Sequence, residues 1–165
     1  MVATVTDYGV HSLWVSPDID LHLVASSVSA AMAERAGGRA VVARLPVAPD
    51  SYHAPERREA RHELGIEEDS SVALIAGGGW GIGDTEESAR CVFDSGIYVL
   101  VVTGHNRSLK TRLENRYASE RRVRGLGWTD QMPQIMAAAD YLVQNAGGCL
   151  AWRRWRWACP LSCSM

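Results

Sequence analysis

Val72–Gly83 reads VALIAGGGWGIG, and this stretch decides the fold that we expect for the chain. Its first part, Val72–Ala76, is an uninterrupted apolar run with the length of a buried strand. The glycine-rich part that follows leads to Asp84, a residue type suited to cap a helix that continues to about residue 93. A strand, a tight loop and a helix in this order form a βα unit, so the stretch predicts a parallel sheet covered by helices.

The same alternation recurs on both sides of this stretch. Towards the carboxyl terminus we expect strands over 97–103, 122–124 and 141–143, and helices over 108–118 and 131–138. Towards the amino terminus we expect strands over 21–25 and 41–45, and helices over 27–36 and 57–64 that end at glycines. The expected fold class is therefore α/β, with a Rossmann-like parallel sheet.

Prolines indicate where the chain divides. Pro46, Pro49 and Pro55 crowd one stretch, and their missing N–H groups and fixed φ angles prevent a continuous helix or central strand there. We therefore read 46–55 as a linker between two lobes. A chain of 165 residues has room for about one ordinary domain of 100–150 residues, so two complete domains are not expected.

Composition excludes several classes of function. The chain is 47% hydrophobic and 22% charged, as in soluble globular proteins, and its formal net charge of −2 provides no basic field for nucleic acid. No apolar run approaches the roughly 20 residues of a membrane-spanning helix. The four cysteines form no Cys-x-x-Cys pair and no signal peptide is evident, which favours a reduced, cytoplasmic setting. The five histidines lack the short spacings of metal ligands, so no metal site is expected.

The glycine-rich loop has two interpretations. Gly77, Gly78, Gly79, Gly81 and Gly83 stand between a strand and a helix, where backbone N–H groups can approach a phosphate. The spacing fits neither the dinucleotide fingerprint nor the P-loop, in which a lysine would stand where this chain has Asp84. A lysine-free site for a diphosphate and a flexible turn remain, and the number of glycines favours the diphosphate site.

Three further loops follow expected strands. They contain Gly104-His105-Asn106, Gly127-Trp128-Thr129 and Asn145-Ala146-Gly147-Gly148. Ligands of open parallel sheets bind at the carboxyl ends of the strands, so we expect all four loops to meet at one edge. For His105 two interpretations are equally supported by its position: it is a residue of the site, or it is an ordinary loop histidine. Trp128 is interpreted as a packing residue in preference to a base-stacking one, because aromatic side chains bury so much area.

These ordered motifs resemble one family of enzymes. The glycine loop, Val101–Asn106, Gly125–Met132 and the stretch from Ala139 to Gly148 are similar to the carboxyl-terminal domain of family 28 glycosyltransferases. Within that family the resemblance points to monogalactosyldiacylglycerol synthases and bacterial diacylglycerol glycosyltransferases. Thr6–His11, with Trp14 and Asp20, resembles the end of the amino-terminal domain of the synthases. The resemblance extends from residue 1 to about residue 148.

The resemblance implies a GT-B fold, in which the active site lies between two Rossmann-like lobes. Residues 1–45 would be the end of the acceptor-side lobe, and 56–148 an incomplete donor-binding lobe. Gly77–Gly81, Trp80 included, and Gly147-Gly148 would surround the donor diphosphate, with the backbone near Gly127-Trp128-Thr129 at the uracil. Transfer would need neither metal nor cofactor, and loop dipoles would stabilise the leaving nucleoside diphosphate. Asp7 and His11 would lie on the acceptor side as candidate catalytic residues.

The last segment departs from the family. After Gly148 the family continues through a Leu-Glu-Ala helix and a Gly-Leu-Pro-Val strand, whereas 149–165 is rich in tryptophan and arginine. With permitted codons for these residues, a shifted frame encodes Leu-Glu-Ala-Leu-Ala-Val-Gly-Leu-Pro-Val. We therefore interpret 149–165 as an out-of-frame, poorly packed tail on a chain truncated at both ends. The alternative is a genuine Trp/Arg segment that binds a membrane interface or anionic phosphate.

The functional hypothesis is a hexosyltransferase that moves a sugar from a UDP-sugar to a diacylglycerol-type lipid, peripheral at the inner face of the membrane. This chain itself would then be an inactive fragment of that enzyme. A noncatalytic nucleotide-binding remnant and a related GT-B sugar-nucleotide epimerase are the alternatives.

Overall fold

The computed structural model describes residues 1–44, 55–81, 83–144 and 161–163. The chain forms two compact units, one built on Met1–Val47 and the other containing Ala48–Asn145. Most of the expected linker over 46–55 lies outside the described residues. The two units are described separately below.

The amino-terminal unit is a small parallel sheet with one helix. Strands β1 (Val2–Val5), β2 (Leu21–Val24) and β3 (Ala40–Val42) pair in the order β1-β2-β3. A 3-10 turn, η1 (Ser12–Trp14), interrupts the connection between β1 and β2, and helix α1 (Ser27–Arg35) joins β2 to β3. The hydroxyl of Ser26 accepts a hydrogen bond from the amide of Ser29 and caps α1.

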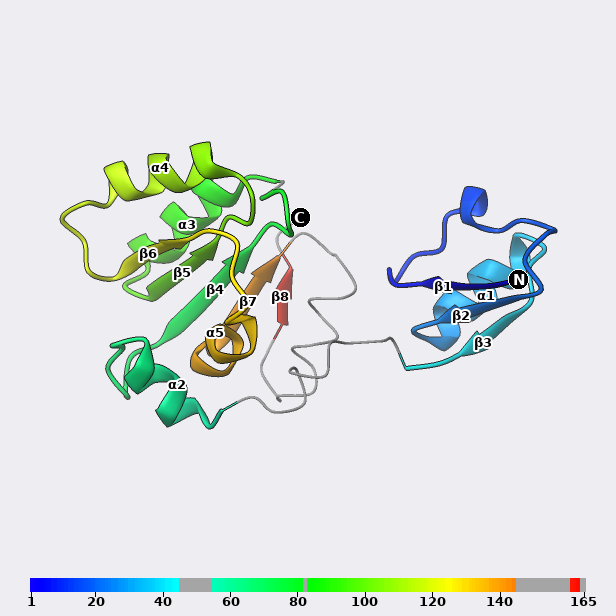
Figure 1. The fold of residues 1–165 in the computed structure, drawn as a ribbon, viewed down its shortest axis with the longest axis horizontal. Coiled ribbons are helices and arrows are strands. Elements are labelled where there is room, and N and C mark those ends of the chain that lie inside the picture. Colours follow the sequence, from blue (N-terminus) through cyan, green and yellow to red (C-terminus); the bar gives the residue numbers. More distant parts are fainter. Residues whose placement is uncertain (45–54, 82, 145–160, 164–165) are drawn as a thin grey trace. The chain divides into compact units, whose positions relative to one another are not determined.

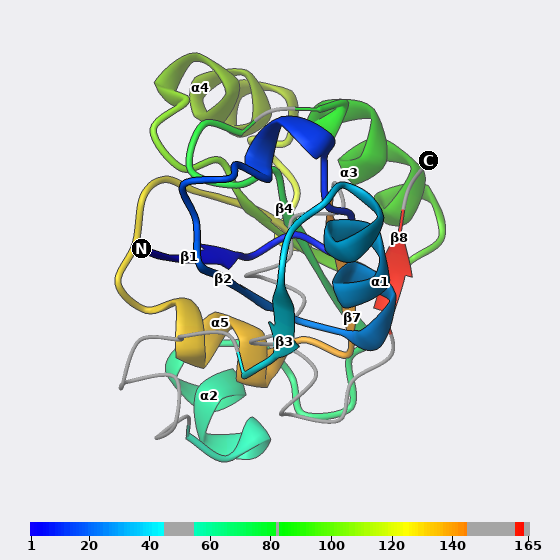
Figure 2. The ribbon, with the colours of Figure 1, turned by 90° about the vertical axis from the view of Figure 1, so that its right-hand side faces the viewer.

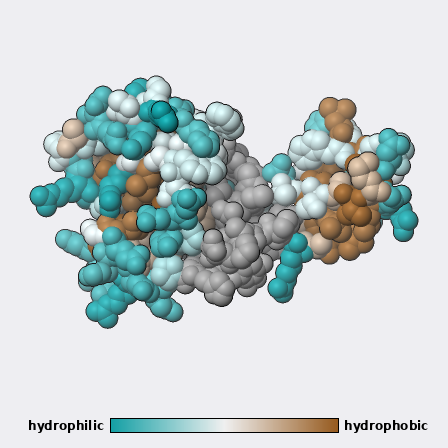
Figure 3. Space-filling model, viewed as in Figure 1, coloured by the Kyte–Doolittle hydropathy of each residue, from teal (hydrophilic) through white to brown (hydrophobic). Residues whose placement is uncertain are grey.

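Much of the apolar surface of this unit stays exposed. Val5, Val10, Val24 and Ala33 form its core. The exposed fraction reaches 85% for Leu13 and 66% for Val28. Figure 3 shows the resulting hydrophobic surface over the unit that contains β1 to β3. An apolar surface of this kind is typical of a site where another element, a partner or a lipid packs.

The second unit is built on a five-stranded parallel sheet. Its strands are β4 (Val72–Ala76), β5 (Tyr98–Val102), β6 (Val123–Leu126), β7 (Tyr141–Gln144) and β8 (Leu161–Cys163), in the order β6-β5-β4-β7-β8. All five residues of β4 are buried, as its uninterrupted apolar run predicts. The order places β4 at the centre, so the glycine-rich loop leaves the middle of one sheet edge.

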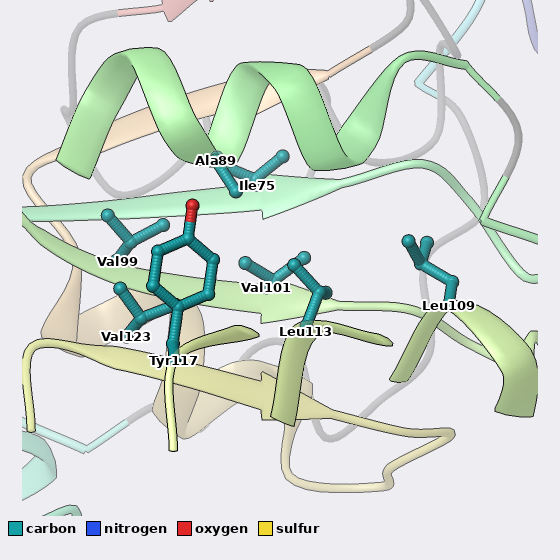
Figure 4. Close-up of a cluster of buried hydrophobic side chains, with 8 residues drawn as sticks. All are labelled: Ile75, Ala89, Val99, Val101, Leu109, Leu113, Tyr117 and Val123. Atoms are coloured by element: carbon teal, nitrogen blue, oxygen red, sulfur yellow. The ribbon is translucent and has the colours of Figure 1, made fainter. Parts of the chain in front are cut away.

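Helices cover both faces of this sheet (Figures 1 and 2). Helices α3 (Thr85–Asp94) and α4 (Arg107–Arg116) lie on one face, where Ile75, Val99, Val101, Leu109 and Leu113 share a buried cluster (Figure 4). Helices α2 (Arg57–Glu63) and α5 (Met132–Ala138) contact each other on the opposite face. The expected α/β fold class is therefore confirmed.

The structure differs from the expected elements at both ends of the chain. Strand β1 was not expected, because Val2–Val5 is a short run without turn residues ahead of it. We also expected residues 149–165 to be a poorly packed tail. Leu161–Cys163 instead forms β8 and pairs in parallel with β7. An edge strand presents free N–H and C=O groups, which any extended segment within reach can bind.

Candidate functional site

Three loops of the second unit meet at the carboxyl edge of the sheet. They follow β4, β5 and β6, which are parallel neighbours. The amide of His105, in the second loop, donates a hydrogen bond of 2.8 Å to the carbonyl of Gly79 in the first. Thr103 donates from its amide, at 2.8 Å, and from its hydroxyl, at 3.1 Å, to the carbonyl of Leu126 at the end of β6. These bonds fix the three loops against one another.

The glycine-rich loop is a packed turn. Gly78, Gly81 and Gly83 have φ angles of 73°, 58° and 103°, in the left-handed region that favours glycine. The amide of Gly81 donates to the carbonyl of Gly78 at 3.1 Å, and a β-carbon at Gly81 would lie 2.8 Å from the carbonyl oxygen of Thr103. The loop therefore rests on the connection between β5 and α4, which argues against a purely flexible turn.

The loop also leaves donors free. Within the part of the chain that the structure describes, the backbone N–H groups of Gly78, Gly79 and Trp80 have no hydrogen-bond acceptor. Consecutive free N–H groups in a turn with left-handed residues form a concave site for an anion. This arrangement suits a phosphate group without any lysine.

Three aromatic rings gather over these loops. The ring of His105 stacks on that of Trp128, with centroids 4.3 Å apart and planes 11° apart, and lies 5.7 Å from the tilted ring of Trp80. Trp80 is 71% exposed and Trp128 is 62% exposed. The expectation that Trp128 is a packing residue is therefore wrong, because its loop holds the ring on the sheet edge against His105 and not beneath a helix.

Two polar residues of the expected site support the fold. The side-chain oxygen of Asn106 accepts a hydrogen bond of 2.9 Å from the amide of Leu109 and caps α4. The hydroxyl of Thr129 accepts one of 3.0 Å from the amide of Gln131, just before α5. Their oxygens therefore fix the directions in which the two loops leave the sheet edge.

Two carboxylates, Asp84 and Glu86, lie near the glycine loop at the start of α3, and arginines of α4 pair with Glu86. Asp84 occupies the position before α3 but makes no side-chain capping bond, contrary to its expected role. The hydrogen bond from Arg112 lowers the pKa of Glu86, with a smaller contribution from Arg116. Both arginines belong to α4, so the ion pairs of Glu86 join the start of α3 to α4.

The remaining predicted residues lie elsewhere. Asp7 and His11 follow β1 in the amino-terminal unit, where the Nδ1 atom of His11 accepts a bond of 3.2 Å from the amide of Leu13. In that tautomer Nε2 carries the proton, so a base role for Nε2 requires the bond to be released. Asn145, Gly147 and Gly148 lie outside the described residues. Among the described residues, no cluster of side chains has the make-up of a metal site.

The sequence did not single out two features of this edge. One is the ring cluster, which only the adjacency of the strands brings together. The other is Gln144 at the end of β7, which is 4% exposed and whose Oε1 atom has no partner. A polar residue closing an apolar strand is the signal that could have identified it.

Solved structures define the class to which this fold belongs. A crystal structure of the Anabaena protein HepE in complex with UDP and glucose matches 98% of this chain and 52% of its own, with a TM-score of 0.58 and 17% identity. WaaG, a glycosyltransferase involved in lipopolysaccharide biosynthesis, matches 89% of this chain and 56% of its own, with a TM-score of 0.57 and 16% identity. The chain has the α/β fold of GT-B glycosyltransferases.

Several curated relatives are enzymes that attach sugars to diacylglycerol. Monogalactosyldiacylglycerol synthase 1 of Arabidopsis thaliana is 30% identical over 83% of this chain, and the probable synthase of Glycine max is 34% identical over 62%. The processive diacylglycerol beta-glucosyltransferase of Bacillus pumilus is 24% identical over 87%. The expected resemblance is therefore confirmed, and this chain is a homologue of those enzymes. No family model matches the chain.

The chain spans only part of these relatives. It covers 21% of the Glycine max protein, 28% of the Arabidopsis protein and 39% of the Bacillus protein. Among the described helices none is both long enough and apolar enough to span a bilayer.

Proposed function

We propose that the protein represented by this chain transfers a hexosyl group from a UDP-sugar to a diacylglycerol-type lipid. The observation that carries the proposal is the set of three loops fixed at one sheet edge, with the N–H groups of Gly78, Gly79 and Trp80 unpaired. The names of the relatives, which are diacylglycerol glycosyltransferases, support the choice of acceptor. The solved relative that binds UDP and glucose supports the choice of donor.

The loops would act mainly on the leaving group. When the bond between the sugar and the diphosphate breaks, negative charge develops on the phosphate oxygens. Free N–H groups held by a packed turn are already oriented for that charge, so they stabilise it without reorganisation. Gly77–Gly81 and Gly147-Gly148 would surround the diphosphate, and the backbone at Gly127-Trp128-Thr129 would meet the uracil. No metal and no cofactor takes part in this proposal.

Asp7 and His11 are the proposed acceptor-side residues. A base must remove the proton of the lipid hydroxyl as the new glycosidic bond forms. His11 is exposed, so its imidazole can reach a substrate once the bond from the amide of Leu13 is released. His11→Ala should then lower kcat far more than it weakens UDP binding.

Binding of UDP, measured by calorimetry, tests the donor half of the proposal. The protein extended at both ends to the length of its relatives should bind UDP and transfer sugar to diacylglycerol. If the extended protein binds no nucleotide sugar, the proposal fails. Epimerisation of UDP-N-acetylglucosamine without transfer would instead support the epimerase alternative.

The second candidate function is noncatalytic nucleotide binding by the chain as it stands. This candidate is supported because the chain contains the loops proposed to bind the nucleotide, whereas it covers only 28% of the Arabidopsis synthase. Sugar transfer by the 165-residue chain and by the extended protein should be compared under the same conditions. Turnover by the 165-residue chain alone would rule this candidate out.

A peripheral position at the inner face of the membrane, on the cytoplasmic side, is part of the proposal. The exposed apolar side chains of the amino-terminal unit, Leu13 and Val28 among them, support it. The protein should sediment together with diacylglycerol-containing vesicles, and Leu13→Ser should weaken that association. Equal cosedimentation of the variant would argue against a contribution from Leu13.

A further inference from the structure

One buried hydroxyl joins helix α1 to the loop that contains the acceptor-side residues. The hydroxyl of Ser29, in the first turn of α1, donates a hydrogen bond of 2.7 Å to the carbonyl oxygen of Tyr8. Tyr8 directly follows Asp7 and stands three residues before His11. The loop and the helix start are neighbours because β1 and β2 are parallel strands that end at the same edge of their sheet.

The directions of the hydrogen bonds around Ser29 can be assigned. A carbonyl oxygen can only accept, so the single hydroxyl proton of Ser29 is donated to Tyr8. The hydroxyl oxygens of Ser26 and Ser29 lie 2.8 Å apart, and the proton between them must therefore come from Ser26. Ser26 in turn accepts a bond of 3.1 Å from the amide of Ser29, which caps α1. The cap thus uses the amide of Ser29 and leaves its hydroxyl for the loop.

Helix α1 by itself does not require a hydroxyl at this position. Ser29 has an exposed fraction of 0%, and α1 contains alanine, the better helix former, at Ala30, Ala31 and Ala33. A serine at this buried position is therefore unfavourable for the helix alone. Its bond to Tyr8 lies away from water, where a hydrogen bond is stronger than at the surface. The bond to the loop gives the serine a role that alanine cannot fill.

The loop has a second fixed point. Val10 is 6% exposed and belongs to the apolar core of the amino-terminal unit. Gly9 separates it from Tyr8 and is exposed, and a β-carbon at Gly9 would meet nothing within 4 Å. Burial of Val10 therefore holds the side of the loop that leads to His11. The bond to Tyr8 holds the side that contains Asp7.

Resting on the proposed function, we propose that Ser29 positions the acceptor-side residue Asp7 for sugar transfer. Its hydroxyl holds the carbonyl of Tyr8, and this bond fixes the backbone from which the Asp7 carboxylate extends. Ser29 is then a positioning residue, because it acts through Asp7. Among the described residues, the hydroxyl of Ser26 bonds to Ser29 and not to Tyr8, so the two serines of this turn differ in role.

The 165-residue chain itself tests the positioning. In Ser29→Ala the backbone order parameters of residues 7–9, measured by NMR relaxation, should fall from about 0.85, typical of rigid backbone, towards about 0.6. Ser26→Ala is the matched control, because it removes the cap of α1 and leaves the donor to Tyr8 in place. Both substitutions should lower the Tm, but only Ser29→Ala should loosen the loop. Unchanged order parameters in Ser29→Ala would overturn the inference.

Kinetics of the protein extended to the length of its relatives test the consequence for transfer. Ser29→Ala should lower kcat about ten- to hundredfold, as a small misplacement at a reacting centre does, and leave the Kd for UDP unchanged. Ser26→Ala should leave kcat nearly unchanged. Asp7→Asn removes the group that Ser29 positions, so Ser29→Ala should lower kcat no further in that background.

The outcomes separate the role of Ser29 from the function on which it rests. Absence of sugar transfer by the extended wild type overturns the proposed function, and the order parameters then decide the positioning alone. Equal losses of kcat in Ser29→Ala and Ser26→Ala overturn the role of Ser29, because both losses would then follow from the stability of α1. A loss from Ser29→Ala that is as large in Asp7→Asn as in the wild type also overturns it, because Ser29 would then not act through Asp7.

Discussion

Gly104 holds two loops together because it has no side chain. Its φ angle of 58° lies in the left-handed region, and a β-carbon there would lie 2.2 Å from the carbonyl oxygen of Gly79. The amide of His105 donates to that same carbonyl. One absent methyl group therefore allows the hydrogen bond that joins the loops after β4 and β5.

Gly104→Ala should destabilise the second unit strongly. Gly96 is a suitable control, because its φ angle of 82° is also left-handed but its β-carbon would meet nothing within 4 Å. Gly96→Ala should cost about 1–2 kcal/mol, the conformational penalty alone. Gly104→Ala should cost more, because the clash adds to that penalty. Urea denaturation measures both, and equal losses would show that the loops separate without cost.

Tyr117 is a buried ring with an unpaired hydroxyl. The residue is 8% exposed, and its hydroxyl oxygen has no hydrogen-bond partner among the described residues. Burial raises the pKa of the phenol above its ordinary value of 10.0, because the charged form is poorly solvated there. The neutral form is therefore the one that the fold accommodates.

Tyr117→Phe should be neutral or stabilising at pH 7, by up to about 1–3 kcal/mol, because it removes a buried polar group without a partner. Tyr117 has a higher pKa in the folded protein than in the unfolded chain, where it is near 10.0. The stability that this difference contributes is fully present below the unfolded pKa, and it is lost as the pH rises through the folded pKa. The difference in unfolding free energy between the variant and the wild type should therefore widen above about pH 10. Denaturation curves at pH 7 and pH 11 test this, and a constant difference would contradict it.

At the scale of elements, one arginine joins α2 to the sheet. Arg61 is 1% exposed and donates from Nε to the carbonyl of Ala138 at 2.9 Å. It also pairs with Asp140 at 2.7 Å and donates to the carbonyl of Glu68. The same oxygen of Asp140 accepts the amide of Val72 at 2.8 Å, at the start of β4. Arg61 thus connects three segments at the end of the sheet opposite the site.

Arg61→Ala should destabilise the protein by about 3–5 kcal/mol, because it leaves the buried carbonyl oxygen of Ala138 without its donor and removes the buried cation that pairs with Asp140. Arg57 is the internal control: it binds the same Asp140 at 2.7 Å but is 57% exposed. Arg57→Ala should cost no more than about 1 kcal/mol, as exposed ion pairs do. Chemical denaturation of both variants compares the two costs. Similar losses would mean that burial does not decide the strength of this network.

At the scale of the whole molecule, the origin of residues 149–165 is still to be tested. If this segment is out of frame, the nucleotide sequence after Gly148 should encode Leu-Glu-Ala in another frame, followed by Gly-Leu-Pro. The frame-restored protein should also melt at a higher temperature, since it regains a helix and a strand of the core. Sequencing of the gene decides this directly. If no frame encodes Leu-Glu-Ala, the segment is genuine and its composition needs a functional explanation.

Strand β8 provides a test of the alternative, that the segment 149–165 is a genuine part of the protein. Leu161–Cys163 covers the edge of β7, so removal of residues 161–165 should expose free backbone groups and promote aggregation. Removal of 164–165 alone leaves β8 in place and serves as the control. Static light scattering during heating measures the difference. If both versions aggregate at the same temperature, β8 contributes nothing to protecting the edge.

The sequence by itself determined most elements of the second unit, although not β1 in the first unit or β8 at its own edge. The buried run over β4 was predicted with its observed bounds, and α2 to α5 within about two residues, because hydrophobic periodicity and glycine caps act locally. The resemblance of the ordered motifs to family 28 glycosyltransferases likewise implied the GT-B fold and the homology to diacylglycerol glycosyltransferases. Those features are carried by residues close together in the chain.

Tertiary structure decided everything that depends on which loops become neighbours. The stack of His105 on Trp128, the clash that excludes a side chain at Gly104 and the pairing of β8 with β7 each join residues from separate strands. The sequence could not distinguish Gly79 from Gly81, since both are glycines of one loop. The structure does, because a side chain fits at Gly79 and collides with the carbonyl of Thr103 at Gly81. Free space around a residue is set by chain segments distant in sequence, and only folding brings those segments together.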